Sequence, residues 1–157
     1  MVQAGNIRYR FSVVIMNSSE EKGIIEAFVA RWVIKNRRER ALFELTHEKK
    51  RSMFIDRLNH QWESVLDMRY LVKVGKADDS LEGLYRIMRI DLNYAHYAIS
   101  TYPELDGRIM QLSEGLVCVY ARGFASLLVS AAADVLYLET EQVQGPPARF
   151  TGHWRLT

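Results

Sequence analysis

Cysteine, proline and glycine are scarce in this chain of 157 residues, which has one cysteine, three prolines and nine glycines. The single cysteine, Cys118, cannot form an intrachain disulfide, so small secreted disulfide scaffolds are excluded. The low proline and glycine content excludes a long linker, a collagen-like repeat and a low-complexity scaffold. Long hydrophobic runs are also missing, since nothing approaches the about 18 consecutive apolar residues of a membrane-spanning helix. We therefore expect a globular protein that makes no membrane contact.

Targeting and catalytic signatures are equally scarce. The first residues lack the basic-then-apolar layout of a signal peptide, so a cytoplasmic location is expected. The sequence has no glycine-rich nucleotide-binding loop and no Gly-x-Ser-x-Gly elbow. Its four histidines lack the spacing of a zinc site, and Cys118, between two valines, is expected to be a buried, inert thiol. The sequence thus predicts no cofactor and no metal, and it favours a non-catalytic protein over an enzyme.

The composition is that of one folded domain. Hydrophobic residues make up 48% of the chain and charged residues 25%, which is typical of globular proteins. A chain of this length buries roughly 70% of the surface that its unfolded form exposes, which is enough for one sizeable core. We expect residues 1–157 to form a single domain.

The first half of the chain has clear periodicities. Alternating apolar residues over 7–16 predict a long central strand, and helical spacing predicts a helix over 18–33 that begins with a capping box of Ser18 and Glu21. A second helix is expected over 46–66, and a strand over 68–74.

The second half predicts a short helix, an extended segment, a longer helix and three closing strands. Their expected ranges are, in that order, 81–88, 94–101, 105–119, 124–130, 134–141 and 149–156. The closing strands are too near one another for helical crossovers, so that part of the sheet should be antiparallel. We therefore predict an α+β fold: a mixed sheet with an antiparallel C-terminal part and about four helices packed on one face. One core should bury Trp32, Phe54, Leu58, Trp62, Ile109 and Leu116.

Positive charge gathers between residues 31 and 51, here called the basic segment. It has eight basic and three acidic side chains, a net charge of +5 in a chain whose total is +2. The basic residues are Arg31, Lys35, Arg37, Arg38, Arg40, Lys49, Lys50 and Arg51. Such a cluster can contact an acidic protein surface or a nucleic-acid backbone, whereas a solvated helix end with local ion pairs is the plainer explanation.

Four polar residues near the C-terminus form a second candidate site. Glu139 and Glu141 alternate onto one face of a predicted strand, and Arg149 and His153 on the next strand are expected to lie opposite them. Paired carboxylates can move protons or hold a divalent cation, but cross-strand ion pairing explains the arrangement without chemistry. On the second helix, Asp56 and His60 are one turn apart and are expected to pair locally.

These observations favour a binding or accessory protein whose basic segment contacts an acidic protein surface, either of another protein or of a second copy of this chain. A nucleic-acid partner is the first alternative, and a small enzyme or ligand-binding protein using the C-terminal polar residues is the second. Nucleic acid is less favoured because the aromatic residues of the segment, Trp32 and Phe43, fit an apolar helical pattern. A protein interface also needs an apolar centre, which exposed Phe43 or Leu45 is expected to supply.

Overall fold

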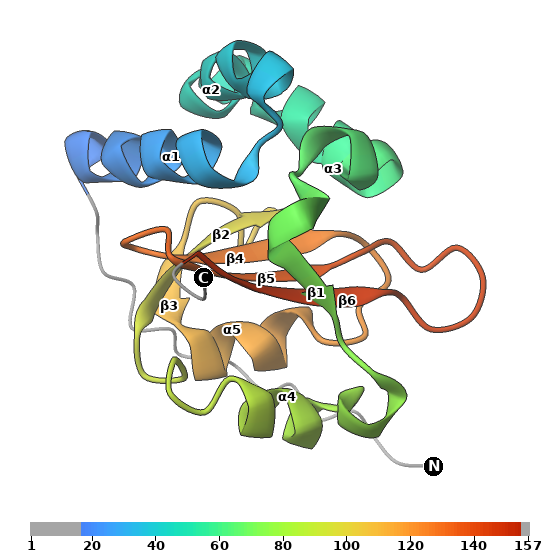
Figure 1. The fold of residues 1–157 in the computed structure, drawn as a ribbon. Helices are drawn as coiled ribbons and strands as arrows, with labels where there is room; N and C mark the ends of the chain where they lie inside the picture. Colours follow the sequence, from blue (N-terminus) through green and yellow to red (C-terminus); the bar gives the residue numbers. More distant parts are fainter. Residues whose placement is uncertain (1–16, 155–157) are drawn as a thin grey trace.

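The structure, a computed structural model, describes residues 17–154, which form an α+β fold of three layers (Figure 1). An antiparallel sheet lies in the middle, with α1, α2 and α3 on one face and α4 and α5 on the other. The predicted strand over 7–16 lies outside the described residues, as does the end of the last predicted strand. The predicted α+β fold class is confirmed. Every described strand pairing is antiparallel, and helices cover both faces of the sheet instead of one.

Along the chain, three α-helices come first, strands and helices are mixed in the middle, and three strands come last. The helices are α1 (Ser18–Trp32), α2 (Arg38–Thr46), α3 (Arg51–Val65), α4 (Leu81–Ile87) and α5 (Leu112–Val119). The strands are β1 (Leu71–Lys73), β2 (Ala95–Ser100), β3 (Ile109–Gln111), β4 (Ser126–Ser130), β5 (Val135–Glu139) and β6 (Arg149–His153). Short 3-10 turns precede α2, α3, β1 and α4, namely η1 (Lys35–Arg37), η2 (Glu48–Lys50), η3 (Met68–Tyr70) and η4 (Lys76–Asp78).

The strands lie in the order β1-β6-β5-β4-β2-β3, so that β1 and β3 are the edges of the described sheet. The interior strands β4 and β5 are fully buried, and their residues alternate between the two faces. Leu127 and Leu136 point toward the α1–α3 layer, whereas Leu128 and Tyr137 point toward α4 and α5. The expected single core is therefore two clusters, one on each face of the sheet.

The α1–α3 layer seals its side of the sheet with large apolar side chains. Trp32, Phe54 and Leu58 are buried there as predicted, whereas Trp62 is only partly buried and stacks on Phe150 with ring centroids 5.0 Å apart. The helix N-cap is Asn17, whose Oδ1 accepts from Glu20 N at 2.8 Å, one residue before the predicted capping box.

The α4–α5 layer packs by close contact of short helices. Leu116 is buried as predicted, but in this second cluster, and Ile109 lies on β3 and is only partly buried. A Cβ atom on Gly115 would lie 2.8 Å from Leu128 Cδ1, so the lack of a side chain lets α5 approach β4. That close packing offsets the intrinsic helix cost of about 1 kcal/mol for glycine.

Three predicted elements were wrong in their boundaries. The helix expected over 46–66 begins later, because Thr46 is the last residue of α2 and the extended backbone at His47, followed by η2, separates α2 from α3. The strand expected over 68–74 begins as η3, and only Leu71–Lys73 pairs with β6.

The third wrong prediction was the helix over 105–119. Gly107, with φ of +75°, forms the turn that folds β3 back onto β2, and only the part from Leu112 is helical. The apolar residues of the turn and of β3 fall at helical spacing by coincidence, which is why periodicity alone merged them with α5.

Candidate functional site

The basic segment spans the end of α1, η1, α2 and η2, and α2 is its centre. This helix lies on the far side of α1 and α3 from the sheet, and is the outermost helix of its layer (Figure 1). Its inner side buries Ala41, Glu44 and Leu45. Leu45, expected as an exposed apolar centre, is only 3% exposed, because it faces the α1–α3 core; Phe43 is 50% exposed.

Half of the predicted binding cations are tied to groups of the protein itself. Arg31 Nη1 donates to Ala132 O, and Arg38 Nε donates to Val33 O at 2.9 Å. Arg40 Nε donates to Glu44 Oε1 at 3.0 Å. Arg51 is paired with Asp106. These four arginines therefore hold the helical layer together as well as adding positive charge.

The other four predicted cations are exposed and have no partner among the described residues. Lys35 and Arg37 lie in η1, before α2, and Lys49 and Lys50 lie in η2, after it. Since α2 has nine residues, the two pairs are separated by about 13 Å of helix. Unpaired positive charges thus lie at both ends of α2.

Between these cations lies an exposed aromatic pair. The rings of Phe43 and His47 stack with centroids 4.2 Å apart, and His47 Nδ1 lies 2.6 Å from Phe43 O. Arg40 precedes Phe43 by one turn on the same side of α2. The chain continues directly from His47 into η2, where Lys50 N donates to His47 O at 2.8 Å. We call Arg37, Arg40, Phe43, His47 and Lys50 the α2 ridge.

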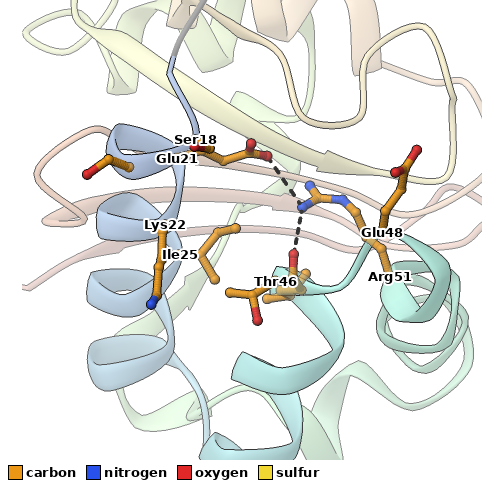
Figure 2. Close-up of a pocket in the computed structure, with 9 residues that line it drawn as sticks. Ser18, Glu21, Lys22, Ile25, Thr46, Glu48 and Arg51 are labelled. Atoms are coloured by element: carbon orange, nitrogen blue, oxygen red, sulfur yellow. Dashed lines mark hydrogen bonds and ion pairs between the residues drawn. The ribbon is translucent and has the colours of Figure 1, made fainter.

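Arg51 lies in an open groove of about 580 Å³ between the start of α1 and the end of α2. Figure 2 shows Ser18, Glu21, Lys22 and Ile25 on the α1 wall, and Thr46, Glu48 and Arg51 on the other. The groove is amphipathic, with three hydroxyl groups and four charged side chains above the apolar surfaces of Ile25 and Leu45.

The guanidinium of Arg51 joins four segments of the protein. Its Nε and Nη2 donate to Asp106 at 2.7 and 2.9 Å. Its Nη1 lies 3.4 Å from Leu45 O and 3.9 Å from Glu21 Oε1 (Figure 2). Burial alone would lower the pKa of Arg51, but the hydrogen bonds and charges of Asp106 and Tyr97 together outweigh this and raise the pKa. Tyr97 lies beneath the guanidinium and donates to Glu21 Oε1 at 2.5 Å. The guanidinium of Arg51 is thus already bound by groups of the protein itself.

The four C-terminal polar residues do not form one site. Glu139 and Arg149 lie directly opposite each other, as predicted, and Arg149 Nε donates to Glu139 Oε1 at 2.8 Å. Glu141 lies beyond the end of β5, so strand alternation does not place it beside Glu139, and it contacts His60 of α3 at 3.2 Å. His153 lies opposite Val135, four residues from Arg149 along β6, and contacts Asp91 at 3.2 Å. The expected polar pocket is therefore three separate polar contacts.

The Glu139–Arg149 pair belongs to a buried polar row that the sequence reading missed. Arg149, Glu139, Ser126 and Ser100 are directly opposite one another on four neighbouring strands, and all are buried. Ser100 and Ser126 are hydrogen-bonded at 2.7 Å, and Arg149 Nη1 donates to Asp79 at 2.5 Å. Ser126 and Ser130, which lie on one face of the otherwise apolar β4 with Leu128 between them, are the sequence signal that marks this face as partly polar.

His96 is a further buried polar residue on the same face. Its Nδ1 lies 2.9 Å from Tyr94 O, and its Nε2 is buried without a hydrogen-bond partner. Burial lowers the pKa of His96, although the Tyr94 carbonyl and the charges of Asp91 and Asp134 oppose this. The imidazole is thus held in its neutral form. Cys118 is buried as expected, and burial raises the pKa of its thiol.

The fold and these clusters define an α+β protein with an antiparallel sheet between two helical layers and an exposed, cation-bracketed helix. Protein-family models, curated proteins and solved structures were compared with the chain, and none matches it. Within residues 17–154, no group of three histidine, cysteine, aspartate or glutamate side chains is placed to hold a metal ion, and no helix is long and apolar enough to cross a membrane.

Proposed function

We propose that this protein is a non-catalytic docking module that binds an acidic, hydrophobic segment of another protein on the α2 ridge. The observation that carries the proposal is the exposed Phe43–His47 stack at the centre of the ridge, with unpaired cations at both ends of the helix. The proposal places the protein in the cytoplasm, where a single unpaired thiol stays reduced.

The ridge combines the two features that a protein interface needs. An apolar centre supplies most of the affinity when it is desolvated, and a charged rim speeds the encounter and fixes the orientation of the partner. Phe43 is a large side chain that is half-exposed although it lies beside a buried core, so covering it would stabilise a complex. The side chain of Met53 is also exposed, on the first turn of α3 after Lys49 and Lys50, and widens the apolar surface.

The distribution of charge along the ridge favours a different protein over a second copy of this chain. In a two-fold contact between two α2 helices, each cationic end of one helix meets a cationic end of the other. Such like-charge contacts are destabilising, and they would surround a contact made by Phe43 alone. A partner with carboxylates on both sides of an apolar side chain meets no such repulsion.

A protein partner also fits better than a nucleic acid. Glu39 and Glu48 are exposed within the same stretch and would repel a phosphate backbone. Phe43 and His47 stack on each other, so this pair offers one aromatic surface and not the succession of surfaces on which single-stranded bases stack.

The test is selection of ligands from a random 12-residue peptide library displayed on phage, with the intact protein as bait. We expect enriched peptides to carry aspartate or glutamate on both sides of a phenylalanine, leucine or tryptophan. Fluorescence anisotropy with a selected peptide should show binding that weakens with salt. Phe43→Ala should abolish it, and Lys49→Gln with Lys50→Gln should weaken it. The matched control is Val72→Ala, since Val72 is an even more exposed apolar residue, on β1.

Each alternative has its own outcome in the same experiment. A basic or charge-free consensus, or binding unaffected by Phe43→Ala, overturns the proposal. Tight binding of a 20-nucleotide single strand that is lost in Phe43→Ala makes the protein a nucleic-acid binder instead. A dimer in sedimentation at low salt that Phe43→Ala dissociates makes the occupant a second copy of the chain.

A further inference from the structure

Two arginines contact one buried carboxylate at the junction of α2 and α3, and a third arginine lies one turn away along α2. Glu44, on the inner side of α2, has a side chain only 3% exposed. Arg40 Nε contacts its Oε1, and Arg57 Nη2, from α3, contacts its Oε2. Arg37 stands one turn before Arg40, at the N-cap of α2. The cluster therefore contains three positive charges and one negative charge.

The single carboxylate leaves most of the guanidinium donors unused. Each guanidinium has five N–H groups, and Glu44 engages one nitrogen of Arg40 and one of Arg57. Among the described residues, Arg37 has no partner, the terminal nitrogens of Arg40 have none, and Arg57 has none besides Glu44. Unused donors thus remain on all three arginines.

The cluster also carries repulsion that a bound anion would remove. Burial lowers the pKa of Arg57, and the positive charges of Arg40 and Arg37 lower it further. Arg40 is 54% exposed, so an anion can approach from solvent without opening the core. The net charge of +2 matches the charge of about −2 on a phosphorylated side chain, whose three oxygens can each accept hydrogen bonds.

We propose that Arg37, Arg40 and Arg57 form a binding site for a phosphoryl group, supplied by a phosphorylated serine or threonine in the partner that docks on the α2 ridge. This inference rests on the proposed docking function, since the partner would bring the phosphate to the end of the ridge next to Phe43. Arginine suits this role because its planar fork of donors binds phosphate oxygens in pairs. Glu44 keeps the empty cluster together by neutralising one of its three charges.

The site is tested by titrating the 15N-labelled protein and following the Nε–Hε resonances of its arginines. The probes are phosphoserine in an acidic peptide, the same peptide with serine, the same peptide with glutamate, and inorganic phosphate, all at constant ionic strength. We expect saturable shifts of Arg40 and Arg57 with the phosphopeptide, and binding at least tenfold tighter than for the serine peptide.

Two variants move the affinity in opposite directions if the site binds phosphate. Arg40→Gln should weaken binding of the phosphopeptide about tenfold, as expected for a lost charge-assisted contact. Glu44→Gln should tighten it, because the competing carboxylate is gone. Arg37→Gln, at an exposed residue without partners, should weaken binding without affecting the fold, which keeps the test valid if other variants are destabilised. Lys73→Gln, at an exposed lysine on β1 outside the α2 ridge, is the matched control and should leave binding of the phosphopeptide unchanged.

The outcomes separate this inference from the docking function. If the serine and phosphoserine peptides bind equally through Phe43, docking stands and the phosphate site is wrong. If inorganic phosphate binds as tightly as the phosphopeptide, the site takes a free anion and the partner-borne phosphate is wrong. If variants of the three arginines change stability but no probe gives a saturable shift, the cluster is purely structural.

Discussion

The two faces of the sheet differ in the side chains that they bury, which are apolar on one face and partly charged or polar on the other. The face under α1–α3 presents apolar side chains such as Ile99, Leu127 and Leu138, and the unpaired cations of that layer lie outside, at the ends of α2. The face under α4 and α5 buries charged and polar groups, among them Glu139 and Arg149. The α1–α3 layer therefore keeps four unpaired cations at the two ends of α2, whereas Arg149 on the other face is used inside the fold.

This difference predicts at which buried residues a substitution lowers the stability of the fold most. Apolar packing is not directional, so its loss is graded with the volume removed. A buried ion pair is different, because deleting one partner leaves the other charge desolvated and uncompensated. Glu139 has no exposed surface and its Oε2 has no hydrogen-bond partner, so its other oxygen depends on Arg149 and Tyr137.

The largest expected effect comes from breaking the buried pair. Arg149→Met should lower the free energy of unfolding by about 3–5 kcal/mol, because Glu139 would remain buried without its cation. The double variant Arg149→Met with Glu139→Leu should recover most of the loss, since neither charge remains. Chemical denaturation measures both. The control is Arg122→Met, which removes a solvent-exposed pair with Glu104 and should cost at most about 1 kcal/mol. Equal losses in the two single variants would contradict the contrast between the two locations.

An intermediate effect is expected from pH, through His96 on the same face. The unfolded chain protonates this histidine near pH 6.5, whereas burial holds it neutral to lower pH in the folded state. The unfolded state then binds more protons, so stability is full above about pH 6.5 and falls as the pH is lowered, by at most about 1.4 kcal/mol per pH unit. Urea titrations between pH 7.5 and 5 should show a smaller slope for His96→Gln than for the wild type. If the stabilities of the wild type and of His96→Gln fall equally with pH, His96 is not the group that causes the loss.

The smallest effect is expected on the outer side of α2. Lys49→Gln with Lys50→Gln should change the free energy of unfolding by less than about 0.5 kcal/mol, because neither side chain has a partner among the described residues. Thermal denaturation is sufficient to measure it. A larger loss would mean that these lysines stabilise the fold, and would weaken the case that they are reserved for a partner.

Much of the fold followed from periodicity, and its failures have physical causes. The alternation over Val135–Glu139 identified β5 and the stripe from Ile24 to Trp32 identified α1, because one pattern ran through each element. The prediction of one helix over 105–119 failed because the apolar residues of a turn, a three-residue strand and a helix together have helical spacing. The decisive signal there was Gly107, whose positive φ is needed for the turn.

The candidate site was predictable only in part. Charge counting located the basic segment, but it could not distinguish Arg51, held by Asp106 from a distant loop, from Lys49 and Lys50 beside it. Likewise, Arg57 belongs to the arginine cluster through α3, six residues after the basic segment ends. Such pairings depend on contacts between residues far apart in the chain, which spacing along the sequence does not encode.

The shortness of the two edge strands makes it harder for copies of this protein to join through their sheets. β1 and β3, the edges of the described sheet, have three residues each, whereas the four strands between them have five or six. A foreign strand adds to a sheet by pairing with a continuous row of free N–H and C=O groups, and edges this short offer few of them. Lys73 ends one edge, and the exposed Arg108 precedes the other, so both also carry charges that oppose stacking of like chains. The long, apolar strands that would be most prone to form fibres are paired on both sides, and their aggregation would first require the sheet to open.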